Sequence, residues 1–233
     1  MKMDRNSSQY AKGHPWIFLA IWLGMQAVSA LVMATWSTKN FYLRNWMYCP
    51  QGFFVITMLF LLVGPVIIAV MHRPKSLTEL YEMFSLSASW SEIRFYWMLC
   101  GIIVASLISL WPTTWGGGSR IVTEIIGKAQ TEGGSAYIVA AMVLGPIPEE
   151  AILRGYLYRT FSAVYGRRIG IVIVALLNVA LHSNSINGSL FAACFFTVMG
   201  ILLCYIFDSR RNLLDCIVFH VGYNATIIFL ALL

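Results

Sequence analysis

Two adjacent glutamates, Glu149 and Glu150, interrupt an apolar stretch of this chain in the segment GPIPEEAILRGYLYR, residues 145–159. A charged side chain at the centre of a bilayer costs about 2.5–3.5 kcal/mol on insertion scales, so ionisable residues in such stretches are functional candidates. Glu150 and Arg154 are four residues apart, a spacing that predicts an ion pair on one side of a helix. Glu149 is rotated by about 100° from Glu150 around the axis. The pattern predicts that Glu150 orders the site and that Glu149 is the reactive carboxylate.

The prolines before the glutamates predict a break in the helix. Pro146 and Pro148 cannot donate a backbone hydrogen bond, but proline suits the first turn of a helix. We expect the chain to unwind at residues 145–147 and the helix to restart at Pro148. The glutamates would then lie in a first turn, where the helix dipole favours negative charge.

Two histidines and an amide follow in later apolar stretches. His182 ends the segment NVALH, and His220 and Asn224 are four residues apart in HVGYN, so the latter two share one side of a helix. At about 1.5 Å of rise per residue, Glu149, His182 and His220 reach similar depths and can converge on one cavity. Taken singly, a buried His or Asn more often bonds a neighbouring helix. That reading stays open for His182 and is the one predicted for Asn178.

The composition places these residues in a membrane protein. The chain has 233 residues, of which 59% are hydrophobic and 11% charged, whereas soluble domains carry about 25% charged residues. Apolar runs of about 20 residues recur, and each is long enough to span a bilayer as a helix. Basic residues are not interleaved with stacking aromatics, so nucleic acid is not an expected partner. We predict an all-α, polytopic transmembrane helical bundle with the lipid bilayer as its surroundings.

About seven spans and one short interfacial helix are expected, in a single membrane-embedded domain covering residues 1–233. The spans fall near residues 16–36, 52–71, 95–111, 135–165, 169–184, 189–207 and 213–233. Ser76-x-x-Glu79 is a predicted capping box at the start of the interfacial helix. The net charge of +6 and the distribution of Lys and Arg predict a multi-pass protein of the cell membrane with a cytoplasmic N-terminus and an external C-terminus. A cleaved signal peptide is the alternative for the first span, whose apolar stretch is long for that role.

EEAILR at 149–154 resembles the EExxxR signature of the CAAX protease and bacteriocin-processing family of intramembrane endopeptidases, also called Abi proteins. NVALH and HVGYN stand in the order of that family's FxxxH and HxxxN motifs. The resemblance covers about residues 136–226, the expected catalytic core, and residues 1–135 resemble the family only as generic spans and loops. One departure is visible, because Asn178 stands where the family has phenylalanine, which puts the shape of the cavity and the substrate preference in doubt.

The resemblance implies a role for each residue. Glu149 and His182 would hold and activate a water, His220 and Asn224 would stabilise the oxyanion, and Glu150 and Arg154 would order the site. A carboxylate for acid–base work and preset donors for an oxyanion suit peptide hydrolysis. No Ser or Cys is flanked by a base at these positions, so a covalent nucleophile is not expected.

A metal ion is the open point of the predicted site. Two histidines and a glutamate are the ligand set of several catalytic zinc sites, but here they come from separate helices without HExxH. A ligating histidine usually donates its second nitrogen to an acceptor, and the sequence identifies none. We therefore expect a direct glutamate–histidine mechanism without a cofactor, with a divalent metal such as zinc as the lesser alternative.

The main hypothesis is an intramembrane endopeptidase acting on a membrane-associated peptide or protein. Prenylated CAAX proteins, peptide pheromones and bacteriocin precursors all fit, and the sequence fixes neither the substrate nor the oligomeric state. The first alternative is a non-catalytic membrane scaffold or bacteriocin self-immunity protein on the same fold. The second is a transporter whose polar cluster relays protons or binds an ion.

Overall fold

The computed structural model describes residues 15–24, 62–86, 94–109, 127, 138–182, 186 and 189–232. Throughout these residues the regular structure is helical, which confirms the predicted all-α class. Two apolar helices, Pro15–Gly24 and Leu62–His72, come first. The later elements are α5 (Leu77–Met83), α6 (Tyr96–Ser109), η3 (Ala140–Leu144), α9 (Pro146–Glu150), η4 (Ala151–Tyr158), α10 (Arg159–Tyr165), α11 (Arg167–Leu181), α13 (Leu190–Arg210) and α14 (Leu213–Leu232).

Two of these helices, α13 and α14, are long and apolar enough to cross a membrane. The expected spans at 95–111 and 169–184 correspond to the shorter helices α6 and α11. The first two expected spans, 16–36 and 52–71, extend beyond the described residues, as does most of residues 112–135. The number of seven spans and the orientation of the termini therefore stay predictions.

The segment that carries the two glutamates is helical without the predicted unwinding. Gly145 has φ −61° and ψ −50°, and α9 begins at Pro146 rather than at Pro148. The predicted break at 145–147 is wrong because the fixed φ of proline is compatible with a helix, and the prolines lie in the first turn of α9, where their missing backbone donors cost little. The helix accommodates this loss beside η3, a π-helix, whose i→i+5 hydrogen bonds make a wider turn. Glu149 lies in the first turn of α9, as predicted, and α9 runs directly into η4.

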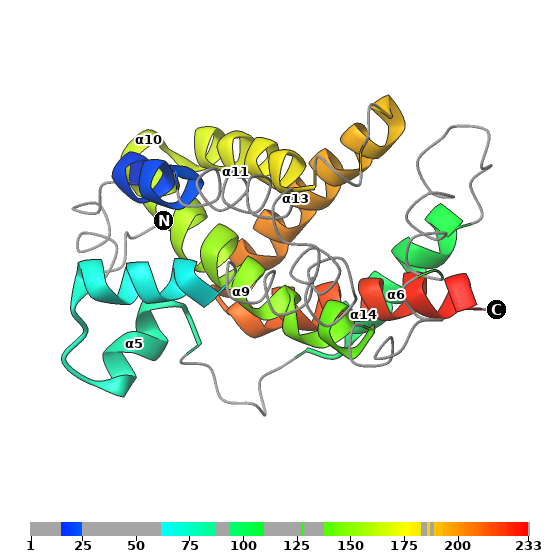
Figure 1. Cartoon of the computed structure of the whole chain (residues 1–233), viewed down its shortest axis with the longest axis horizontal. Coiled ribbons are helices and arrows are strands. Elements are labelled where there is room, and N and C mark those ends of the chain that lie inside the picture. Colours follow the sequence, from blue (N-terminus) through cyan, green and yellow to red (C-terminus); the bar gives the residue numbers. More distant parts are fainter. Residues whose placement is uncertain are drawn as a thin grey trace, which may run out of the picture.

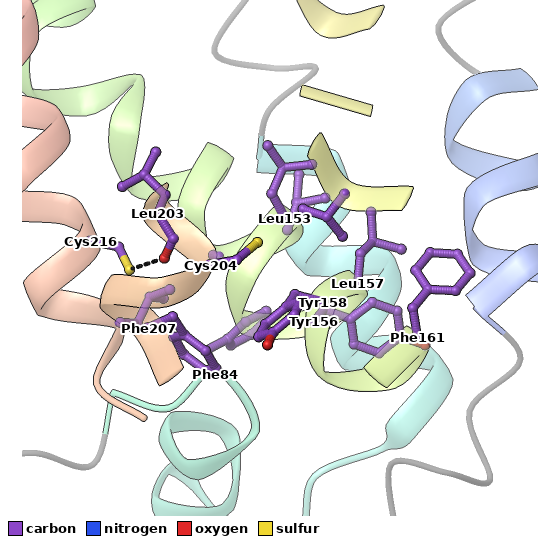
Figure 2. Packing of buried hydrophobic residues seen from close by; sticks show 14 of the residues in the cluster. Phe84, Leu153, Tyr156, Leu157, Tyr158, Phe161, Leu203, Cys204, Phe207 and Cys216 are labelled. Carbon is purple, nitrogen blue, oxygen red and sulfur yellow. Dashed lines mark hydrogen bonds between the residues drawn. The ribbon is translucent and has the colours of Figure 1, made fainter. Parts of the chain in front are cut away.

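The segment η4 is the centre of the core. All eight of its residues are buried. Figure 2 shows Leu153, Tyr156, Leu157 and Tyr158 gathered with Phe161, Phe84 and residues of α13, and a hydrogen bond from Cys216 Sγ to Leu203 O at 3.4 Å. Tyr158 also donates to the Asp208 carboxylate at 2.5 Å, which ties η4 to the end of α13. Arg154, which belongs to this segment, is therefore surrounded by tightly packed apolar side chains.

The segment that ends α5 is bound by one arginine, Arg159, the first residue of α10. The N-cap residue of α5, Ser76, accepts from Glu79 N at 3.1 Å, as the predicted capping box requires, although the Glu79 carboxylate accepts from Lys75 N rather than from Ser76 N. Arg159 Nη1 donates to Met83 O at 2.8 Å and to Ser85 Oγ at 2.9 Å. Residues 77–83 are thus a separate short helix, and its position at a membrane surface stays a prediction.

Helices α6 and α14 lie side by side (Figure 1) and cross at two glycines. A Cβ on Gly101 would lie 2.2 Å from Phe219 O, and one on Gly222 would lie 2.5 Å from Met98 O. Both contacts are with backbone atoms, so a side chain at either position forces the helices apart. This close approach sets the position of α14, which carries His220 and Asn224.

We expect Gly101→Ala to lower the stability of the fold. Overpacking typically costs about 1–3 kcal/mol, which outweighs the gain of about 0.5–1 kcal/mol from replacing glycine by alanine in a helix. Thermal unfolding of the purified protein in detergent measures the difference. The matched control is Gly24→Ala, whose Cβ would have nothing within 4 Å and which should unfold at the wild-type temperature or above. Equal midpoints for the two variants would contradict the close crossing.

Candidate active site

Glu150 lies at the centre of a buried cluster of charged side chains. Its Oε1 accepts from Arg154 Nη1 at 3.1 Å and from His220 Nδ1 at 2.8 Å. The side chains of Glu150 and Arg154 are wholly buried, and that of His220 is 10% exposed. The predicted pair of Glu150 and Arg154 is present, and α14 adds a third member from 70 residues further along the chain.

The other polar atoms of Glu150 and Arg154 have few hydrogen-bond partners among the described residues. Arg154 Nη2 reaches Gly200 O on α13 at 3.5 Å, which is a long contact. Within the described residues, Glu150 Oε2 and Arg154 Nε are buried without a hydrogen-bond partner. A buried ion pair of this kind is weak evidence for net stability, but breaking it is costly because the remaining charge is left uncompensated.

Glu149 is placed differently from its neighbour, as the spacing predicts. Its side chain is half-buried where Glu150 is buried. Its charge acts on His182, on His220 and on Arg154. The structure therefore brings Glu149 close enough to interact electrostatically with Arg154, His182 and His220.

His182 follows directly after the last residue of α11 and caps that helix. Its Nδ1 lies 2.8 Å from the backbone oxygen of Asn178. Because a carbonyl oxygen only accepts, Nδ1 carries the hydrogen and the neutral ring keeps a lone pair on Nε2. The imidazole is thus set up to accept a hydrogen bond from a water through Nε2.

Asn178 makes the interhelical bond that was predicted for it. Its Nδ2 donates to Phe196 O on α13 at 2.9 Å, and its side chain is buried. Phe196 in turn stacks on His182, with ring centroids 4.3 Å apart and an interplanar angle of 21°. Sequence reasoning missed Phe196 because it belongs to none of the motifs and lies on a helix where aromatic residues are expected as core.

Asn224 lies on α14 one turn beyond His220, half-buried. Between them Tyr223 stacks on Phe195 of α13, with ring centroids 5.6 Å apart. Helix α14 therefore contacts α13 at Phe195, the residue next to the Phe196 that stacks on His182. The predicted site residues come from α9, η4, α11 and α14, and the structure brings α9 and α14 together directly.

The predicted site contains the types of donor that a zinc site uses. Each histidine has the acceptor that a ligating histidine usually needs. Asn178 O serves His182 and the Glu150 carboxylate serves His220, and the sequence had identified neither. In the described part of the chain, however, no three His, Cys, Asp or Glu side chains converge into a group that could hold a metal ion.

One family model matches this region of the chain. Residues 132–226 match the family described as Type II CAAX prenyl endopeptidase Rce1-like. No curated protein and no solved structure gives a significant match to the chain. The matched range contains all six predicted site residues and nearly coincides with the predicted catalytic core at 136–226, which confirms the resemblance drawn from the motifs.

Proposed function

We propose that this chain, whose residues 132–226 match the Rce1-like type II CAAX prenyl endopeptidases, is an intramembrane endopeptidase that uses Glu149 and His182 to activate a water. The observation that carries the proposal is the bond between Glu150 and His220. It joins the two parts of the chain that hold the family's first and last motifs and fixes one imidazole beside a second carboxylate. A scaffold needs no such buried charge.

The attack begins at the half-buried Glu149. Its carboxylate takes one proton from a water, and His182 Nε2 accepts a hydrogen bond from the second hydrogen and holds the oxygen in place. The water oxygen then forms a bond to the carbonyl carbon of the peptide, and the carbonyl electrons move to oxygen. General-base assistance of this kind contributes about 10²–10⁴-fold to a rate.

His220 and Asn224 face the developing oxyanion in this proposal. With Nδ1 donating to Glu150, His220 can donate only from Nε2, which then must carry a proton, and the Glu150 carboxylate balances the resulting charge. Donors fixed in advance at an oxyanion are among the largest contributions to acyl transfer. Glu149 then returns its proton to the leaving nitrogen as the C–N bond breaks, so the enzyme ends each turnover unchanged.

Within this cycle the charges of the site balance. Glu149 and Glu150 carry two negative charges, and Arg154 and a protonated His220 carry two positive ones. A balanced cluster suits a buried position, because an unpaired charge there is strongly destabilising. The mechanism needs no metal ion.

The experiment is cleavage by the purified full-length protein in proteoliposomes. The substrates are a peptide ending in a CAAX-type sequence with a prenylated cysteine, the same peptide without the prenyl group, and a mixture of unmodified peptides from membrane-associated proteins. Mass spectrometry detects the new carboxyl terminus. We expect cleavage of at least one substrate by the wild type and cleavage about 10²–10⁴-fold slower by Glu149→Gln.

Two further results decide between the alternatives. Treatment with 1,10-phenanthroline should leave the rate unchanged, whereas a loss that is restored by added Zn²⁺ would show a zinc enzyme. If no substrate is cut by correctly folded wild-type protein, the endopeptidase proposal is lost. The scaffold or self-immunity reading then takes its place.

A further inference from the structure

The aromatic surface against the His182 ring comes from a neighbouring helix. The FxxxH motif that NVALH resembles has phenylalanine at the position of Asn178, one turn before the histidine. Here the ring that stacks on His182 belongs to Phe196 of α13, at 4.3 Å between centroids. Aromatic neighbours prefer defined relative orientations, so Phe196 fixes the plane of the imidazole.

Asn178 forms a hydrogen bond with each of the two residues whose rings are stacked, His182 and Phe196. Its backbone oxygen accepts from His182 Nδ1 at 2.8 Å, which fixes the direction of the imidazole within its plane. Its side chain donates Nδ2 to Phe196 O at 2.9 Å, which fixes the residue that carries the stacking ring. One residue therefore positions the histidine in two ways, once directly and once through Phe196.

The backbone of α13 is shaped to allow this contact. A Cβ on Gly200, one turn after Phe196, would lie 2.9 Å from Ala175 Cα and 3.3 Å from Asn178 Cβ. The absence of a side chain at Gly200 lets α11 approach α13 closely enough for the short Asn178 side chain to reach Phe196 O. A phenylalanine at position 178 would have to fit into the same narrow space.

We propose that Asn178 and Phe196 are positioning residues that direct His182 Nε2 at the reacting water. This inference rests on the proposed endopeptidase function. It also makes a claim about the orientation and tautomer of His182 that holds whether or not a substrate is known.

The kinetic test compares two replacements of Phe196. Phe196→Leu keeps an apolar side chain but loses the stacking ring, and we expect it to lower kcat by about ten-fold or more, because small misplacements of a catalytic group can cost up to about 10²-fold. KM should not change. Phe196→Tyr keeps the ring and should restore the wild-type kcat.

The matched control is Phe195→Leu, which removes an aromatic ring from the neighbouring position on α13 that stacks on Tyr223 rather than on His182. It should retain the wild-type kcat. Asn178→Leu, which keeps the backbone oxygen and the volume but loses the Nδ2 donor, should lower kcat in the same way as Phe196→Leu. Equal kcat values for Phe196→Leu and the wild type would overturn the proposal.

A second measurement does not depend on activity. ¹⁵N NMR of histidine-labelled protein, with the His182 signals assigned through His182→Gln, reports which ring nitrogen carries the hydrogen at neutral pH. We expect hydrogen on Nδ1 in the wild type and in Phe196→Tyr, and a mixture of tautomers in Phe196→Leu and Asn178→Leu. An unaltered tautomer in Phe196→Leu and Asn178→Leu refutes the positioning role even if the protein cleaves peptides. The altered tautomer together with an inactive wild type refutes the proposed function instead.

Discussion

Replacing Glu149 by glutamine is expected to lower the rate of peptide cleavage by about 10²–10⁴-fold, the range contributed by general acid–base groups. The amide keeps the size of the side chain but cannot take a proton from water. Because Glu149 is half-buried and its charge acts on His182 and His220, the loss should fall on kcat and leave the fold unchanged. Initial rates in proteoliposomes measure the effect, and the thermal midpoint in detergent checks the fold.

The matched control for this variant is Glu82→Gln, a change of the same kind at an exposed carboxylate on α5. It should cleave at the wild-type rate. An active Glu149→Gln enzyme would rule out Glu149 as the base and would direct attention to His182 as the group that takes the proton.

Replacing Glu150 by glutamine is expected to reduce both stability and activity. The wholly buried Arg154 loses its anionic partner at 3.1 Å, and breaking a buried pair from one side costs about 3–5 kcal/mol. His220 loses the charged acceptor of its Nδ1 hydrogen at 2.8 Å, so the oxyanion donor is no longer held. Unfolding in detergent and cleavage rates measure the two effects separately.

The double variant Glu150→Gln with Arg154→Met separates the two roles of Glu150. Removing both members of a buried pair is often close to neutral, so the double variant should recover most of the stability that the single variant loses. It should stay inactive, because His220 still lacks its carboxylate. Recovery of activity together with stability would mean that Glu150 serves the fold alone.

The short-range part of the site could be predicted from the sequence. The spacing of Glu150 and Arg154 fixes their positions on one helix, and an apolar chain leaves few partners for a buried charge, so the pair at 3.1 Å was expected. The bond from Asn178 to another helix was expected for the same reason. Both predictions need only helical geometry and the free-energy cost of burying a polar group without a hydrogen-bond partner.

The contacts between distant segments could not be predicted in this way. The bond of His220 to Glu150 spans 70 residues, and no spacing rule states which of two adjacent carboxylates an imidazole will reach. The stacking of Phe196 on His182 depends on the close approach of α13 to α11 at Gly200, which the sequence does not show. The start of the helix at Pro146 was misjudged because the sequence does not show that wide π-helical turns lie on both sides of α9.

The pairing of Glu150 with Arg154 also has a consequence for how the chain is made. The two residues lie four positions apart in one segment, whereas His220 lies on α14 near the end of the chain. During synthesis the carboxylate can therefore be neutralised by the guanidinium as soon as its own segment enters the bilayer, long before α14 is translated. A lone carboxylate would add about 2.5–3.5 kcal/mol to that insertion step. Arg154 thus neutralises Glu150 during membrane insertion, and His220 binds to the pair only when α14 packs against the other helices.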